Sequence, residues 1–207
     1  MAAYGHWCYN RTMNEGDPKT VLIKPLERAD LDQLNSLFSC SEASDRCRCM
    51  WFIKSVKTYH ADGPDGNWAD FKELAQTDTE ELGLIAIADG QAVGWCALGP
   101  RFRFARGIKA PSFKGRDPSE DDSAWLLPCL FVAPSFRGKG LTALLIENAV
   151  AHARSRGAAC LEAFPYVGTK RRSKDVQIGF SPQFEAQGFV ETRRPSPNRS
   201  VMRLDFI

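Results

Sequence analysis

Two apolar stretches with an amphipathic stretch between them constrain the fold of this chain more than any other feature. Residues 125–132 read WLLPCLFV, which is typical of a strand covered on both faces, and Pro128 favours a bulge in that strand. Residues 141–156 place Leu and Ala at helical spacing before Gly157, a natural helix stop. Residues 159–164 are apolar again. This order predicts a strand–helix–strand crossover, which joins parallel strands.

Antiparallel structure is predicted on both sides of this crossover. Residues 84–88 and 92–98 are compatible with strands, and the Asp89-Gly90 pair between them is a strong hairpin signal because both residues tolerate positive φ angles. Further elements are expected as a strand over 21–27, a helix over 29–38, a helical piece over 68–74, a short helix over 182–187, and strands over 189–193 and 200–206.

Two other segments show no regular pattern. Residues 1–20 mix Gly, Asn, Asp and Pro and are interpreted as a lead-in, which leaves 21–207 as a single domain. Residues 101–123 carry Arg, Lys, Gly, Pro and Asp with little periodicity, and they predict a long surface loop. Loops of this length commonly act as lids or are mobile.

The composition excludes several classes of partner. Lys and Arg number 27 against 25 Asp and Glu, so the net charge of +2 gives no general reason to expect binding to nucleic acid. No uncharged apolar run reaches the roughly 18 residues of a membrane-spanning helix, and no membrane association is expected. Seven cysteines without an apolar N-terminal signal favour a reducing, cytoplasmic compartment.

A glycine-rich loop where the buried strand meets the long helix is the strongest candidate for a binding site. Glycines let backbone N–H groups converge on one point, and the first turn of a helix adds unpaired donors and partial positive charge. Arg137 and Lys139 bring full charges to the same place, which indicates a phosphate or pyrophosphate ligand.

Two nucleotide-binding patterns compete for this loop. A nucleoside-triphosphate P-loop requires Ser or Thr directly after its Lys, whereas Gly140 follows Lys139. A dinucleotide fingerprint is satisfied literally by Gly138, Gly140 and Ala143, and it keeps an NAD(P)-binding protein as an alternative. Five residues separate the strand from the first glycine, however, and an antiparallel hairpin precedes the crossover; neither feature suits that fold.

The run FVAPSFRGKGL at 131–141, followed by an Ala- and Leu-rich helix, resembles the acetyl-CoA motif of the GNAT superfamily of N-acyltransferases, with Arg137, Gly140 and Thr142 at its signature positions. The Cys-x-Cys-x-Trp stretch at 47–51 and the LEAFP stretch at 161–165 are similar to those of a bacterial subgroup. The resemblance implies an α+β fold in which helices flank a mixed, mainly antiparallel sheet around the central crossover.

The resemblance also implies a function. It is transfer of acetyl from acetyl-CoA to a primary amine of a small molecule or peptide, by direct attack in a ternary complex and in a monomer or homodimer. A non-catalytic acyl-CoA-binding or sensing protein on the same fold is the alternative. The residues that the resemblance assigns to acetyl-CoA are Leu130, Phe131, Val132, Arg137, Gly138, Lys139, Gly140, Leu141 and Thr142.

Direct transfer requires a proton acceptor and often a proton donor. Glu162, on the second strand of the crossover, is the predicted base, with a structural carboxylate as the alternative. Many superfamily members supply the acid from a Tyr at the position that Phe184 occupies here, so Tyr166 is the candidate acid. A wall of the acceptor pocket is predicted from Cys47, Cys49, Trp51 and Phe52, and no metal is expected because these cysteines lack a paired C-x2-C spacing.

Overall fold

A computed structural model describes residues 9–11, 20–168 and 178–206. One sheet carries eight strands in the order β1-β2-β3-β4-β5-β6-β8-β7, and only the β5–β6 pair is parallel. The strands are β1 (Tyr9–Arg11), β2 (Val21–Pro25), β3 (Gly83–Ala88), β4 (Gln91–Pro100), β5 (Ala124–Val132), β6 (Cys160–Ala163), β7 (Val190–Ser196) and β8 (Arg199–Asp205). The helices are α1 (Leu31–Phe38), α2 (Glu42–Cys47), α3 (Val56–Thr77), α4 (Leu141–Ser155) and α5 (Ser181–Glu185). The predicted mixed, mainly antiparallel α+β fold is confirmed.

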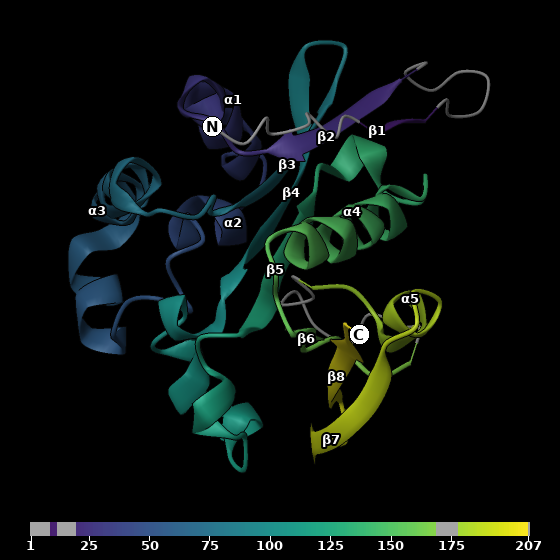
Figure 1. Cartoon of the computed structure of the whole chain (residues 1–207). Helices are drawn as coiled ribbons and strands as arrows, with labels where there is room; N and C mark the ends of the chain where they lie inside the picture. The colour runs from purple at the N-terminus through teal and green to yellow at the C-terminus, as the bar shows by residue number, and fades with distance from the viewer. Residues whose placement is uncertain (1–8, 12–19, 169–177, 207) are drawn as a thin grey trace, which may run out of the picture.

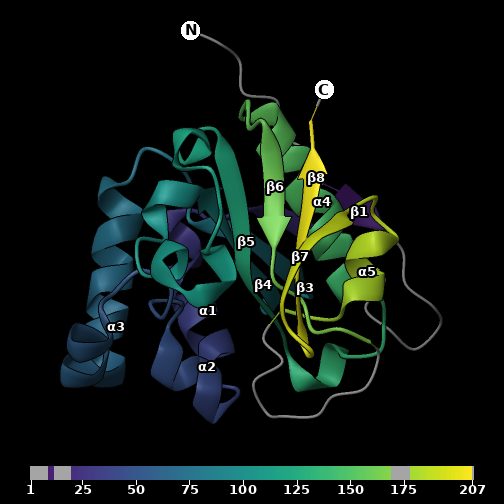
Figure 2. The same ribbon diagram turned by 90° about the horizontal axis from the view of Figure 1, so that it is seen from below.

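Helices cover both faces of the sheet, as Figures 1 and 2 show, with α4 on one side and α1–α3 on the other. Neighbouring residues of β4 show the division, because side chains alternate along a strand. Gly94 lies under α4, where an added Cβ would come within 3.2 Å of Leu141 and 3.1 Å of Leu145. Trp95 faces the other way and packs edge-to-face on Phe38 of α1, with ring centroids 6.2 Å apart. Both faces are therefore apolar cores.

The β3–β4 hairpin forms as the sequence predicts. Asp89 and Gly90 have φ angles of 48° and 76°, the two positive values that a tight two-residue turn requires. The turn fixes the register of β3 on β4 and places β4 beside β5.

A bulge and a divergence mark the middle of β5. Its pairing with β4 shifts between Ala97 and Gly99, opposite Leu127 and Pro128, which confirms the bulge predicted from the proline. The parallel ladder with β6 covers only 124–127 of β5. Beyond Leu127 the two strands are no longer paired, so one edge of β5 is left without a strand partner among the described residues.

Three segments differ from the sequence-based expectation. The helical piece expected over 68–74 belongs to the 22-residue α3, which kinks at Gly63, where φ is 62°. Within the lead-in, residues 9–11 pair with the edge of β2, while 1–8 and 12–19 lie outside the described residues. The expected loop over 101–123 contains four short 3-10 turns and five buried residues, namely Arg101, Arg103, Phe104, Gly107 and Phe113.

We call residues 101–123 the bridging segment. The expectation of a surface loop holds for most of its residues, which are exposed or half-buried, but its buried arginines anchor it through partners elsewhere in the chain. Across the described residues, no helix combines the length and the hydropathy needed to span a membrane.

Candidate active site

The glycine-rich loop leaves the first turn of α4 open to a ligand. A short 3-10 turn (Pro134–Phe136) follows β5, and Gly138 and Gly140 then adopt φ angles of 77° and 82°. Gly140 is the N-cap of α4 and offers no side chain to the helix N–H groups. A Cβ added at either glycine would meet no atom of the protein within 4 Å. The loop therefore presents backbone donors to open space, as an anion site requires.

The two cations of the loop lie close to it. Arg137 is exposed, and its Nε donates to the backbone oxygen of Val132 at 3.1 Å, which holds the guanidinium at the end of β5. Half-exposed Lys139 places its Nζ 5.4 Å from the Phe136 ring centroid. Leu141 is buried in the core, so the structure leaves only its backbone for a ligand, and Thr142 is half-buried beside it.

An open strand edge continues from the loop. Residues 130–132 pair on one side with 94–96 of β4. On the other side, β6 pairs only as far as Leu127, and within the described part of the chain no strand pairs with that edge of 129–132. The geometry fits an extended, amide-containing arm that lies along β5 and ends near the bulge.

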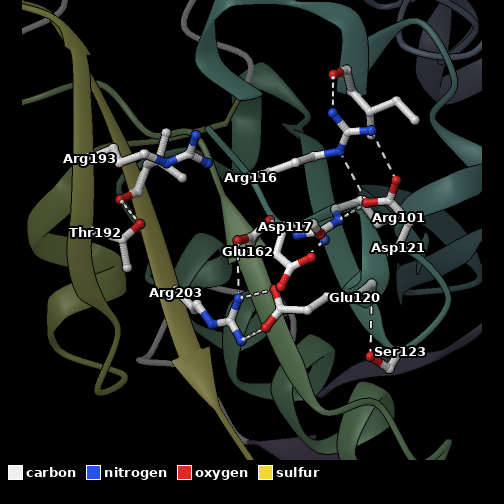
Figure 3. A network of polar contacts seen from close by, with 12 residues as sticks. Arg101, Arg116, Asp117, Glu120, Asp121, Ser123, Glu162, Thr192, Arg193 and Arg203 are labelled. Atoms are coloured by element: carbon white, nitrogen blue, oxygen red, sulfur yellow. Dashed lines mark hydrogen bonds and ion pairs between the residues drawn. The ribbon is translucent and has the colours of Figure 1, made fainter. Parts of the chain in front are cut away.

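Glu162, the predicted base, lies in a buried ion-pair network on the face away from α4, which Figure 3 shows. The Trp125 side chain faces His152 of α4. Successive side chains of a strand point to opposite faces, so Leu126 and its ladder partner Glu162 face away from α4. Oε2 of Glu162 accepts from Nη1 of Arg101 at 3.1 Å, and Oε1 lies 3.6 Å from Nη1 of Arg203. The carboxylate therefore has cationic partners on both oxygens; its role as a base stays a prediction.

Further acidic groups complete this network. Asp121 binds Arg101 at 2.6 Å and Arg116 at 3.0 Å, and Arg116, followed by Arg101, holds the pKa of Asp121 below its usual value. Glu120 forms a two-pronged pair with Arg203 at 2.8 and 3.0 Å, which lowers the pKa of Glu120. Charges of the bridging segment are thus matched by charges of β6 and β8.

The predicted acid lies just beyond β6. The backbone N–H of half-buried Tyr166 donates to Gly179 at 3.0 Å, and its ring lies under the Arg199 guanidinium at 3.8 Å. Phe184, which stands where the resemblance predicts an acidic Tyr in many relatives, is fully buried, and its ring packs edge-to-face on Phe189. The structure gives Phe184 a packing role and leaves the role of Tyr166 as a prediction.

The predicted pocket wall divides into buried and half-buried residues. Cys47 and Cys49 are buried under α1–α3, and Sγ of Cys49 accepts from Nε1 of Trp95 at 3.0 Å. Burial raises the pKa of the Cys47 thiol to about 11. Trp51 and Phe52 are half-buried and face the bridging segment: the Arg106 guanidinium lies 3.3 Å from the Trp51 ring centroid, and Phe52 accepts two backbone hydrogen bonds.

The turn between Cys47 and Cys49 explains how both thiols enter the core. Arg48 and Cys49 have φ angles of 45° and 60°, which are uncommon for residues other than glycine. Arg48 compensates by donating to the side-chain and backbone oxygens of Asn35 at 2.7 and 3.1 Å. The Cys-x-Cys spacing alone gives no sign of this turn.

Comparison with protein families gives one match. The model described as Acetyltransferase (GNAT) family matches residues 47–172, a range that includes the glycine-rich loop, β5, β6 and the bridging segment. A search of curated proteins found no match.

Solved structures share the fold at low sequence identity. The GNAT domain of S. lividans PAT superposes with a TM-score of 0.59 at 15% identity and covers 99% of this chain and 100% of that chain. PaiA N-acetyltransferase from Thermoplasma acidophilum, in complex with coenzyme A, has a TM-score of 0.52 at 16% identity, with 90% and 99% covered. YncA from Salmonella typhimurium, a putative acetyltransferase with its cofactor acetyl-CoA, has a TM-score of 0.51 at 17% identity, with 89% and 93% covered.

Proposed function

Because the chain belongs to the GNAT acetyltransferase family, we propose that it transfers acetyl from acetyl-CoA to a primary amine of a small molecule or peptide. One observation carries this proposal: the uncapped start of α4 adjoins a β5 edge that no described strand pairs with. A pyrophosphate at the start of α4 and an extended amide arm along the unpaired β5 edge would together account for CoA.

Each part of the loop has a task under this proposal. The backbone N–H groups of Gly138 to Leu141 bind the pyrophosphate, and Arg137 and Lys139 offset its charge. The backbone of 130–132 pairs with the pantetheine arm, so the side chains of those residues matter less than their amides. Acetyl-CoA supplies a thioester, whose carbonyl would lie near the β5 bulge under this proposal.

Proton handling is the remaining requirement. The amine acceptor must lose a proton, and the leaving thiolate benefits from a donor. A backbone N–H near the bulge would stabilise the charge that develops on the carbonyl oxygen. Glu162 stays the predicted base and Tyr166 the predicted acid. The ion pairs of Glu162 with Arg101 and Arg203 bear most directly on this prediction, because a base must be free to accept a proton.

The compartment belongs to the same proposal. Six described cysteines are free thiols, five of them buried, which suits a reducing, cytoplasmic setting. PaiA, with CoA bound, and YncA, with acetyl-CoA bound, share the fold and support the choice of cosubstrate.

The test is an amine panel. Purified protein is mixed with acetyl-CoA and with tryptamine, spermidine, glutamate or an N-terminal Ala peptide, and free thiol is followed. Amine-dependent thiol release with a mass gain of one acetyl group on the amine supports the proposal. CoA binding without turnover across the panel would favour the sensing alternative. Thermal stabilisation by NAD or NADP, and none by CoA, would contradict both.

A further inference from the structure

The bridging segment contains a buried arginine, Arg101, to which the proposed function gives no role. Arg101 is fully buried, and its guanidinium donates to Asp121 at 2.6 Å, to the backbone oxygen of Asp117 at 2.5 Å and to Glu162 at 3.1 Å. The first two belong to the bridging segment itself, whereas Glu162 belongs to β6 (Figure 3). Arg101 therefore folds the segment and ties it to the sheet.

Further contacts attach the segment on two sides. Toward the α2–α3 connection, the backbone N–H groups of Arg106 and Gly107 donate to the Phe52 oxygen at 3.1 and 2.9 Å. Toward the far side of β6, the Phe113 ring packs on Phe164 with centroids 4.4 Å apart. The segment therefore bridges the α2–α3 connection and the end of β6.

This bridge passes the point where β5 and β6 separate. Glu162 lies in the last-but-one pair of their ladder, and Phe164 is the first residue after β6. In the proposed function, the CoA arm approaches along β5 from the loop at Arg137 and ends near Cys129. The acceptor amine must then enter from the other side, where the bridging segment lies.

We propose that Arg101 is a positioning residue that acts through Glu162 to hold the bridging segment as the acceptor-side wall, and thereby sets affinity for the amine. The proposal rests on the proposed function for the identity of the two substrates. The role of Glu162 as the anchor of Arg101 competes with its predicted role as the base, and the third test below separates the two roles. Among the described residues, Glu162 without Arg101 would keep only Arg203, at 3.6 Å, and Arg101 without Glu162 would keep only its partners within the bridging segment.

The first test needs no acceptor. Amide hydrogen exchange is compared in the wild type, Arg101→Lys, Arg101→Ala and, as a control, Arg194→Ala, whose ion pair with Glu191 is exposed. Arg101→Ala should speed exchange at Phe102, Gly107 and Ile108 by roughly tenfold or more, Arg101→Lys by less, and Arg194→Ala not at all. Exchange over 137–145 should stay unchanged. Equal exchange of the bridging segment in all four proteins would overturn the proposal.

The second test uses whichever amine of the panel is acetylated. Arg101→Lys should raise KM for that amine about fivefold or more, with KM for acetyl-CoA and kcat within about twofold of the wild type. A lower kcat with an unchanged KM for the amine would overturn the proposal. If no amine is acetylated, the proposed function fails, and the exchange experiment still judges whether Arg101 holds the segment.

Glu162→Gln separates positioning from base catalysis. As an anchor, its loss should raise KM for the amine and leave the shape of the kcat–pH profile intact. The Arg101→Lys variant should show the same profile. A Glu162→Gln enzyme with a normal KM, a much lower kcat and no acidic limb in its profile would restore the base role and contradict the assignment.

Discussion

Arginine side chains have different surroundings in two regions of this molecule. In the glycine-rich loop, Arg137 is exposed beside glycines whose backbone faces open space. In the bridging segment, Arg101 and Arg103 are buried, and their donors are taken up by carboxylates and backbone oxygens of the protein. Under the proposed function the first region receives an anion from outside, whereas the second pairs its arginines with acceptors of the protein itself. The same residue type therefore belongs to a proposed binding site in one place and acts as a structural anchor in the other.

The largest expected effect lies in the buried region. Arg103 donates to the backbone oxygens of Leu98, Glu81 and Glu80 at 2.8 to 3.0 Å and pairs with Asp78 at 2.9 Å. Arg103→Met should lower the free energy of unfolding by about 3–5 kcal/mol, because it leaves these groups without their donor. Urea denaturation measures the change.

Exposed and buried arginines should differ sharply in that experiment. Arg194→Ala serves as the control and should leave the urea midpoint unchanged, because water replaces its exposed ion pair with Glu191. Gly99→Ala offers a second route to the same effect, since an added Cβ would lie 2.0 Å from Nη1 of Arg103. Equal midpoints for Arg103→Met and Arg194→Ala would erase the contrast between the regions.

A smaller effect is expected from a substitution in the glycine-rich loop, and it should weaken CoA binding more than it lowers stability. Gly140→Ala should weaken CoA binding about tenfold, because the added Cβ points into the space reserved for the ligand and the φ of 82° disfavours alanine. Isothermal titration measures the affinity.

Gly115→Ala is its matched control. Gly115, in the bridging segment, has a φ of 85° and equally open surroundings, so its substitution costs about the same 1–2 kcal/mol of backbone strain. It should leave CoA affinity unchanged. If both variants bind CoA equally, the loop is not the site.

The smallest effect concerns the side chain of Glu81, whose backbone oxygen accepts a hydrogen bond from Arg103. Glu81 lies 3.3 Å from Arg156 and 3.6 Å from His152, and His152, with Arg156 adding charge, lowers the pKa of Glu81 to about 2. A lowered pKa adds stability above the ordinary carboxyl pKa, and this stability is lost as pH falls toward 2.

Glu81→Gln should therefore lower the free energy of unfolding near pH 6. The expected loss is only about 1 kcal/mol, because solvent screens the ion pairs of this half-exposed side chain. The cost should shrink between pH 4.5 and 2. Urea midpoints across this range measure it. A cost that is the same at pH 6 and pH 2 would mean that Glu81 contributes through something other than its charge.

The contrast also explains what the sequence could predict. The Asp89-Gly90 turn and the bulge at Pro128 follow from local backbone preferences. The conformation of the loop around Gly138 and Gly140 follows from glycine itself. For these features a few neighbouring residues determine the geometry, so the crossover and the shape of the proposed CoA loop were predictable.

The bridging segment was not predictable in this way. Arg101 and Glu162 are 61 residues apart in sequence, and Arg203 meets Glu120 across 83. A charged stretch without periodicity is typical of a solvated loop, and only the fold brings its partners together. Arg48 and Cys49 repeat the lesson on a smaller scale, since their positive φ angles depend on the contact of Arg48 with Asn35.

One measurement tests the central claim, that CoA binds at the glycine-rich loop and the bridging segment serves the acceptor. Hydrogen exchange of the unaltered protein is measured with and without saturating CoA. Peptides that cover 137–145 should exchange at least about tenfold more slowly with CoA, and those over 101–123 should change little. Protection over 101–123 with none over 137–145 would contradict the account.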